Sequence, residues 1–223
     1  MTRSSLLLAS SFLFAAALGA CDRNQAPPPR VPPPPPPIPG APAVYYRLPV
    51  QGKWRIQRTH YGAKQPDQSF ALDLVPVGKV EKGDERTNAD YPCYGAPVVA
   101  DAPGVIAIAV DGIPDNVPGG PKNVYDQHGN YVVIDHRNGE YSLMAHLIPG
   151  SVKVRPGMAV DAGAELGRCG NTGMSDFPHV HWQVMDNMNA AAARGVPPRF
   201  APYSRNGKPS VDPPERKDTC ENQ

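Results

Sequence analysis

The chain has 223 residues, and its 22 lysines and arginines nearly balance 21 aspartates and glutamates, which gives a formal net charge of +1. Because basic residues are not in excess, the composition argues against nucleic acid as the partner. The sequence also has neither a Gly-x-x-x-x-Gly-Lys phosphate loop nor a Gly-x-Ser-x-Gly nucleophile motif. These absences argue against P-loop nucleotide hydrolases and serine α/β-hydrolases.

Residues 1–20 have the features of an export signal. Arg3 supplies a positive charge, and the apolar run at 6–20 is too short to span a membrane comfortably. The run leads into Leu18-Gly19-Ala20-Cys21, which resembles the bacterial lipoprotein box and implies cleavage before Cys21 and lipidation of its thiol. The alternative is an ordinary secretory signal followed by an incidental cysteine. In both cases we expect the mature chain to be exported.

Residues 21–43 are predicted to comprise the lipidated cysteine and a proline-rich linker. Eleven of the sixteen residues at 27–42 are proline, and such a run favours polyproline II over helix or sheet. At about 3.1 Å per residue it would reach roughly 50 Å. We interpret it as a stiff spacer that lifts the rest of the chain off a membrane; a passive linker and a ligand for a proline-binding domain are the alternatives.

The rest of the chain predicts one mainly β domain at 44–205, followed by a polar tail at 206–223. Asn138-Gly139 separates two apolar runs and indicates a hairpin. A weak helical pattern occurs only at 188–194. We expect a single antiparallel sheet, sandwich-like, with long loops that wall a substrate groove; plain disorder of these loops is the alternative. The expected strands are 69–75, 98–100, 105–109, 131–136, 141–147, 152–154, 165–169 and 179–185, and the long loops are 78–91 and 111–129.

The segment His179-Val180-His181 lies in the last of these predicted strands. Alternate residues of a strand share a face and lie about 6.6 Å apart, so both imidazoles would project together while Val180, Trp182 and Val184 face the core. Two buried imidazoles are costly to desolvate unless something binds them, and a metal ion binds neutral imidazole well. The alternative is a pair of surface histidines on an edge strand.

Three further residues support a metal site. Asp73 lies in the middle of an apolar strand, where an ionised carboxylate needs a cation or several donors. A salt-bridged or capped aspartate is the alternative. His60 precedes Asp73, and His146 lies near the end of the predicted strand 141–147.

These residues resemble the motifs of the lysostaphin/LytM-type zinc endopeptidases, which cut peptides in bacterial cell walls. That family has an early histidine and aspartate, a middle histidine followed by leucine, and a late His-x-His, on a β fold built from a duplicated hybrid motif. The matching positions are His60, Asp73, His146, His179 and His181, and the resemblance covers residues 45–200.

The resemblance implies a role for each matching position. His60, Asp73 and His181 would bind one Zn²⁺ and leave a fourth position open, as a catalytic zinc requires. His146 and His179 would be catalytic, one as a base and the other stabilising the developing oxyanion. Twelve residues separate His60 from Asp73, more than is usual in the family, and we expect this insertion to form a loop.

Three cysteines remain if Cys21 carries the lipid. In an oxidising compartment we expect Cys93, Cys169 and Cys220 to form one disulfide and leave one free thiol. The residues alone leave the pairing open, since Cys220 in the polar tail could pair with Cys93. The resemblance implies a Cys93–Cys169 disulfide, because related sequences have cysteines in similar contexts.

The resemblance also implies the function. The first reading is a zinc-dependent endopeptidase that hydrolyses peptidoglycan stem or cross-bridge peptides during cell-wall remodelling. The alternative is a non-catalytic relative that binds the wall or activates an amidase, but such relatives lack some of the metal residues. Expected partners are peptidoglycan peptides and a membrane, which the chain would reach through the lipid anchor at Cys21. A protein activator is a further possible partner. We expect a membrane-anchored lipoprotein of the bacterial periplasm, on the inner or the outer membrane.

Overall fold

The computed structural model describes residues 40, 42–61, 66–78 and 86–223, which fall within the compact unit Pro34–Gln223. The predicted signal peptide, the lipidation site Cys21 and most of the proline-rich linker lie outside the described residues. Among the described residues, no helix has the length and apolar character needed to cross a membrane.

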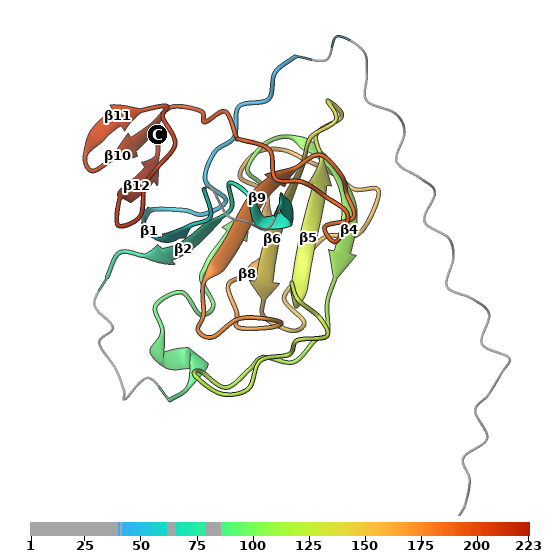
Figure 1. The fold of residues 1–223 in the computed structure, drawn as a ribbon, viewed down its shortest axis with the longest axis vertical. Helices are drawn as coiled ribbons and strands as arrows, with labels where there is room; N and C mark the ends of the chain where they lie inside the picture. The colour runs from blue at the N-terminus through green and yellow to red at the C-terminus, as the bar shows by residue number, and fades with distance from the viewer. Residues whose placement is uncertain (1–39, 41, 62–65, 79–85) are drawn as a thin grey trace, which may run out of the picture. The chain divides into compact units, whose positions relative to one another are not determined.

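Nearly all regular structure in the described residues is β, so the predicted fold class is confirmed (Figure 1). Two single-turn 3-10 helices, η1 (Pro66–Gln68) and η2 (Asn88–Asp90), are the exceptions. The strands are β1 (Lys53–Thr59), β2 (Leu72–Pro76), β3 (Pro97–Val99), β4 (Gly104–Val110), β5 (Asn130–Asp135), β6 (Tyr141–Leu147), β7 (Ala159–Val160), β8 (Glu165–Arg168), β9 (Val180–Met185), β10 (Tyr203–Arg205), β11 (Lys208–Ser210) and β12 (Thr219–Asn222).

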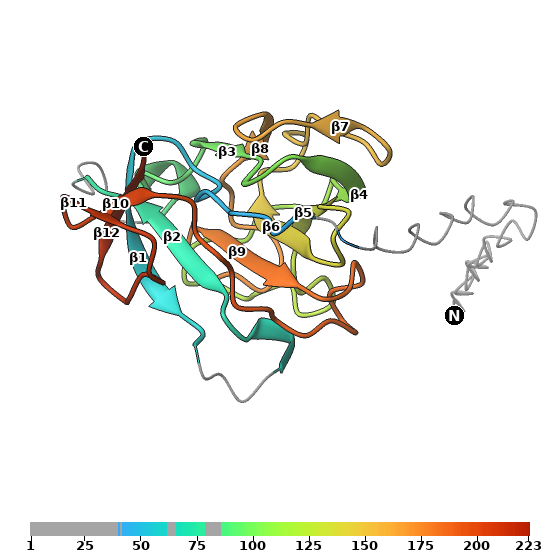
Figure 2. The ribbon, with the colours of Figure 1, turned by 90° about the horizontal axis from the view of Figure 1, so that it is seen from above.

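One large antiparallel sheet carries ten of these strands, in the order β11-β10-β12-β1-β2-β9-β6-β5-β4-β7, while β3 pairs with β8 separately. The main apolar cluster combines Leu74 and Trp182 of the large sheet with Val98 and Leu166 of the small one. The core therefore lies between the two sheets, and Figure 2 shows β3 and β8 next to each other on one side of the large sheet.

The segment 206–223 is not a polar tail, as the sequence predicted, but part of the large sheet. Its last strand, β12, pairs with β1 in the register Lys53↔Glu221, and β10 pairs with β12 (Figure 1). Cys220 is fully buried, whereas its neighbour Glu221 is exposed. The segment looks polar because a short strand buried on one face needs few apolar residues.

Two smaller expectations are also wrong. Residues 188–194 form turns rather than the expected helix. The alanines that suggested a helix instead contribute to packing, because Ala190 and Ala193 belong to a second apolar cluster beside β6 and β9. Residues 152–154 form no strand, although the Lys153 N–H donates to the Leu166 carbonyl across 2.9 Å.

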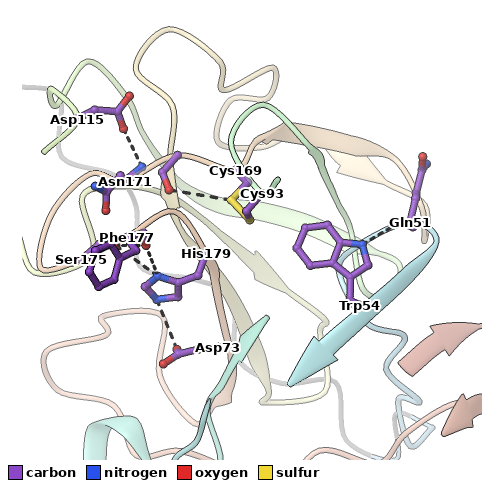
Figure 3. Close-up of a disulfide and its surroundings, with 11 residues drawn as sticks. Gln51, Trp54, Asp73, Cys93, Asp115, Cys169, Asn171, Ser175, Phe177 and His179 are labelled. Carbon is purple, nitrogen blue, oxygen red and sulfur yellow. Dashed lines mark hydrogen bonds and ion pairs between the residues drawn. A yellow bond between two sulfur atoms is a disulfide. The ribbon is translucent and has the colours of Figure 1, made fainter. Parts of the chain in front are cut away.

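Cys93 and Cys169 form a disulfide, the pairing that the resemblance implied, and Cys220 is a free, buried thiol (Figure 3). The bond links the loop before β3 to the end of β8 across a sequence separation of 76 residues. Closing so long a loop restricts the unfolded chain considerably.

We therefore expect Cys93→Ala/Cys169→Ala to lower the free energy of unfolding by about 2–4 kcal/mol. Urea unfolding with and without reductant measures the effect. Reductant should lower the midpoint of the natural chain and leave that of the double variant unchanged. Equal midpoints for the natural chain in both conditions would show that the bond adds no stability.

Candidate metal centre and catalytic groups

The centre of the site lies on three neighbouring strands. Asp73 of β2 pairs directly with His181 of β9, and His181 pairs in turn with Ala145 of β6. Side chains directly opposite each other in an antiparallel pair share a face. Asp73 and His181 therefore project together from the face away from the main core, and each residue is less than a tenth exposed.

A β-bulge in β1 brings His60 to the same face. Ile56 belongs to the main core, and pairing with β2 resumes at Arg58 opposite Asp73, so Gln57 is an extra residue. An extra residue reverses which alternate positions face the core. Beyond the bulge, even-numbered residues turn from the core to the Asp73 face, which places His60 beside Asp73.

A second bulge places His146. Asn130 pairs with Leu147 and Val132 pairs with Met144, so β6 has one residue more than β5 between these pairs. His146 adopts a positive φ of 65° there, a conformation that costs free energy in a non-glycine residue and is typical of functional positions. Met144 and Leu147 both face the core, and His146 turns to the site.

The imidazoles surround one carboxylate. Asp73 Oδ2 lies 3.2 Å from His60 Nε2, and Asp73 Oδ1 lies 2.9 Å from His181 Nδ1 and 3.6 Å from His179 Nε2. Figure 3 shows the His179 ring between Asp73 and the Ser175–Phe177 turn. Burial acts to raise the pKa of Asp73, but hydrogen bonds to His181 and His60 outweigh it and hold the pKa below its ordinary value.

The other two histidines are oriented by backbone carbonyls. His146 Nδ1 donates to the Thr172 carbonyl and His179 Nδ1 donates to the Phe177 carbonyl, each across 2.8 Å. Since a carbonyl only accepts, the proton of each neutral ring is on Nδ1 and the lone pair is on Nε2. Burial is the main cause that lowers the pKa of both rings, so the neutral form is favoured. The rings lie 4.8 Å apart between centroids.

Two residues that the sequence reasoning missed support the site. Gln183 Oε1 lies 3.4 Å from His181 Nε2, so an amide oxygen faces the ring nitrogen that points away from Asp73 and helps to fix the orientation of the ring. Strand alternation could have found Gln183, since it is the next residue on the His179–His181 face. His128 lines the same pocket, and burial is the main cause that lowers its pKa to about 4. In the sequence, the only indication of a role for His128 was its position in the predicted long loop at 111–129.

The side chains fit a divalent cation in two overlapping ways. The ligand atoms of His60, Asp73 and His181 lie within 4.8 Å of one another, and so do those of His146, His179 and His181. Zinc bonds to nitrogen and carboxylate oxygen are about 2.0–2.2 Å, which spaces tetrahedral ligand atoms roughly 3.3 Å apart. The Asp73 contacts of 2.9 and 3.2 Å are near this spacing. The first set also has a carboxylate that offsets the charge of the cation.

The five residues open into a pocket of about 690 Å³. Gln127 and His128 form part of its wall, so the loop at 111–129 does border the site, as the sequence predicted. Phe177 lines both this pocket and a smaller one of about 290 Å³. The site is therefore open to an extended ligand.

The fold and the site together define the class: a β protein whose antiparallel sheet brings several histidines and a carboxylate within ligand distance in a pocket, as a candidate metal centre. The sequence match agrees with this class. Residues 87–193 match the profile of peptidase family M23. Over this stretch, which is just under half of the chain, the protein is similar to the peptidases of family M23.

Particular relatives cover parts of the chain. Peptidoglycan DD-endopeptidase ShyA of Vibrio cholerae is 28% identical over 141 residues, which are 63% of this chain and 27% of that protein. Cell division protein DipM of Caulobacter vibrioides is 29% identical over 119 residues, 53% of this chain and 15% of that protein. The chain thus spans less than a third of either relative.

A solved structure with a similar course of the chain is the catalytic domain of lysostaphin from Staphylococcus simulans. It is 20% identical, and the superposition covers 65% of this chain and 88% of that domain with a TM-score of 0.38.

Proposed function

We propose that this protein is a zinc-dependent endopeptidase that hydrolyses peptide bonds in peptidoglycan stem or cross-bridge peptides. The observation that supports it most is the convergence of His60, Asp73 and His181 on one point, with His146 and His179 beside them. The match of residues 87–193 to peptidase family M23 and the similarity to a peptidoglycan endopeptidase support the same reaction class.

In this proposal His60 Nε2, one Asp73 oxygen and His181 Nδ1 would hold the zinc, which would polarise the scissile carbonyl and make water a better nucleophile at neutral pH. His146 and His179 present unprotonated Nε2 atoms to the pocket. One of them accepts the proton of the attacking water and returns it to the leaving amine. The other would take up one proton from solvent on Nε2 before the attack and donate it in a hydrogen bond to the oxygen that gains negative charge. Their fixed Nδ1–H bonds prevent either ring from turning away.

Lipidation at Cys21 and a place in the bacterial periplasm belong to the same proposal. Their support is the apolar segment that ends at Cys21 and the proline-rich run that follows it. The Cys93–Cys169 disulfide is compatible with an oxidising compartment.

Digestion of purified peptidoglycan, followed by mass spectrometry of the released fragments, tests the proposed reaction. We expect soluble muropeptides with one new amine and one new carboxylate per cut, formed only by zinc-loaded protein and stopped by a chelator. Release of intact stem peptides from the sugar would instead indicate an amidase. No cleavage by zinc-loaded protein, together with stimulation of a separate amidase, would favour the activator alternative.

A further inference from the structure

Two arginines line the pocket that contains Asp73. Arg58 belongs to β1, one residue past the bulge, where it pairs with Asp73 in the register of β1 and β2. Arg216 comes from the connection between β11 and β12, near the end of the chain. Both residues are exposed and lie outside the range 87–193 that matches the family profile. They are therefore features of this chain that the family match does not supply.

Backbone pairing brings the two arginines together. The Lys217 N–H donates to the Ile56 carbonyl across 2.8 Å, and the Ile56 N–H donates to the Asp218 carbonyl across 2.9 Å. Arg216 Nε donates to the Gln57 carbonyl across 3.2 Å. Gln57 directly precedes Arg58, so the connection fixes Arg216 beside Arg58 and leaves the two terminal nitrogens of Arg216 free of this bond.

No carboxylate of the described residues lies within ion-pair distance of either guanidinium. The acids next to Arg216, Glu215 and Asp218, pair with Arg205 instead. Asp73 is surrounded by the imidazoles. The other acid that lines the pocket, Asp176, pairs with Lys122 across 2.8 Å. The Arg58 side of the pocket thus has two positive charges that no described acid neutralises.

We propose that Arg58 and Arg216 bind a free carboxylate of the substrate peptide, so that the enzyme selects peptides with a carboxylate near the scissile bond. This inference rests on the proposed function. A guanidinium offers a planar pair of donors that matches a carboxylate, and such charge-assisted bonds are among the strongest in proteins. Peptidoglycan stem peptides supply such groups at their diamino-acid and terminal residues, and chemical amidation removes the charge.

The test compares two synthetic cross-linked stem peptides that are otherwise identical. One, the acid, has free carboxylates, and the other, the amide, has carboxamides in their place. With zinc-loaded full chain we expect a KM roughly tenfold lower for the acid, since one charge-assisted hydrogen bond contributes about a factor of ten. Arg58→Gln and Arg216→Gln should each raise KM for the acid about threefold with little change in kcat. The double variant should treat acid and amide alike.

Lys217→Gln is the matched control, because Lys217 neighbours Arg216 and does not line the pocket. It should keep the preference for the acid. Loss of the preference in this control would show that general charge, rather than the arginine pair, attracts the peptide. Equal KM values for acid and amide with the natural chain, or a preference that persists in the double variant, would overturn the proposal.

A binding experiment separates this inference from the proposed function. Calorimetric titration of both peptides into the zinc-stripped full chain measures affinity without turnover. If the zinc-loaded chain cleaves neither peptide but the zinc-stripped chain binds the acid about tenfold more tightly than the amide, the hydrolase proposal is wrong and the carboxylate site stands. If cleavage occurs without any difference in affinity or KM, the hydrolase proposal stands and the carboxylate site is wrong.

Discussion

Replacement of Asp73 by asparagine, or of His181 by alanine, is expected to remove bound zinc and peptidoglycan digestion together. Asparagine preserves the shape of Asp73 but removes the negative charge that offsets the cation, and alanine removes the imidazole that both ligand groups share. Loss of an outer-shell partner already lowers metal affinity by about 10–100-fold, so loss of a direct ligand should lower it further. Metal content after dialysis and a zymogram on purified sacculi measure the two effects.

Thermal unfolding supplies an independent readout, because a ligand that binds only the folded state stabilises it. Added zinc should raise the unfolding midpoint of the natural chain and leave that of Asp73→Asn unchanged. Asp161→Asn is the control, since Asp161 is exposed and lies outside the pocket. Full zinc content and full digestion by Asp73→Asn would show that Asp73 is not a ligand.

Replacement of His146 or His179 by alanine should leave zinc in place and lower kcat by about 10²–10⁴-fold, the usual contribution of a positioned proton donor or acceptor. Both rings have Nδ1 bound to a backbone carbonyl and line the pocket. Single-turnover cleavage of a soluble cross-linked peptide, with metal analysis on the same sample, separates chemistry from metal loss.

The second ligand group predicts the opposite pattern. If His146, His179 and His181 held the ion, His146→Ala would lose zinc while Asp73→Asn would retain it. Undiminished kcat in His146→Ala would contradict a catalytic role for this residue.

The sequence alone determined the parts of the site that follow simple strand alternation. His179 and His181 share a face, and Val180, Trp182 and Val184 pack in the core on the other. Asp73 could be placed because an acid in an apolar strand needs a partner, and it pairs directly with His181. The β class and the hairpin at Asn138-Gly139 also follow from local pattern and turn chemistry.

Only the tertiary structure decided where His60 and His146 point. Alternation places each on the core face, and in each case a bulge reverses it. A bulge depends on how two strands pair, so its position is not written in either strand alone. The strands at 203–222 could not be predicted from the sequence either, because they too depend on long-range pairing. Their single buried face is covered only when β12 pairs with β1. Long-range pairing therefore assembled the site from residues that the local pattern could name but not orient.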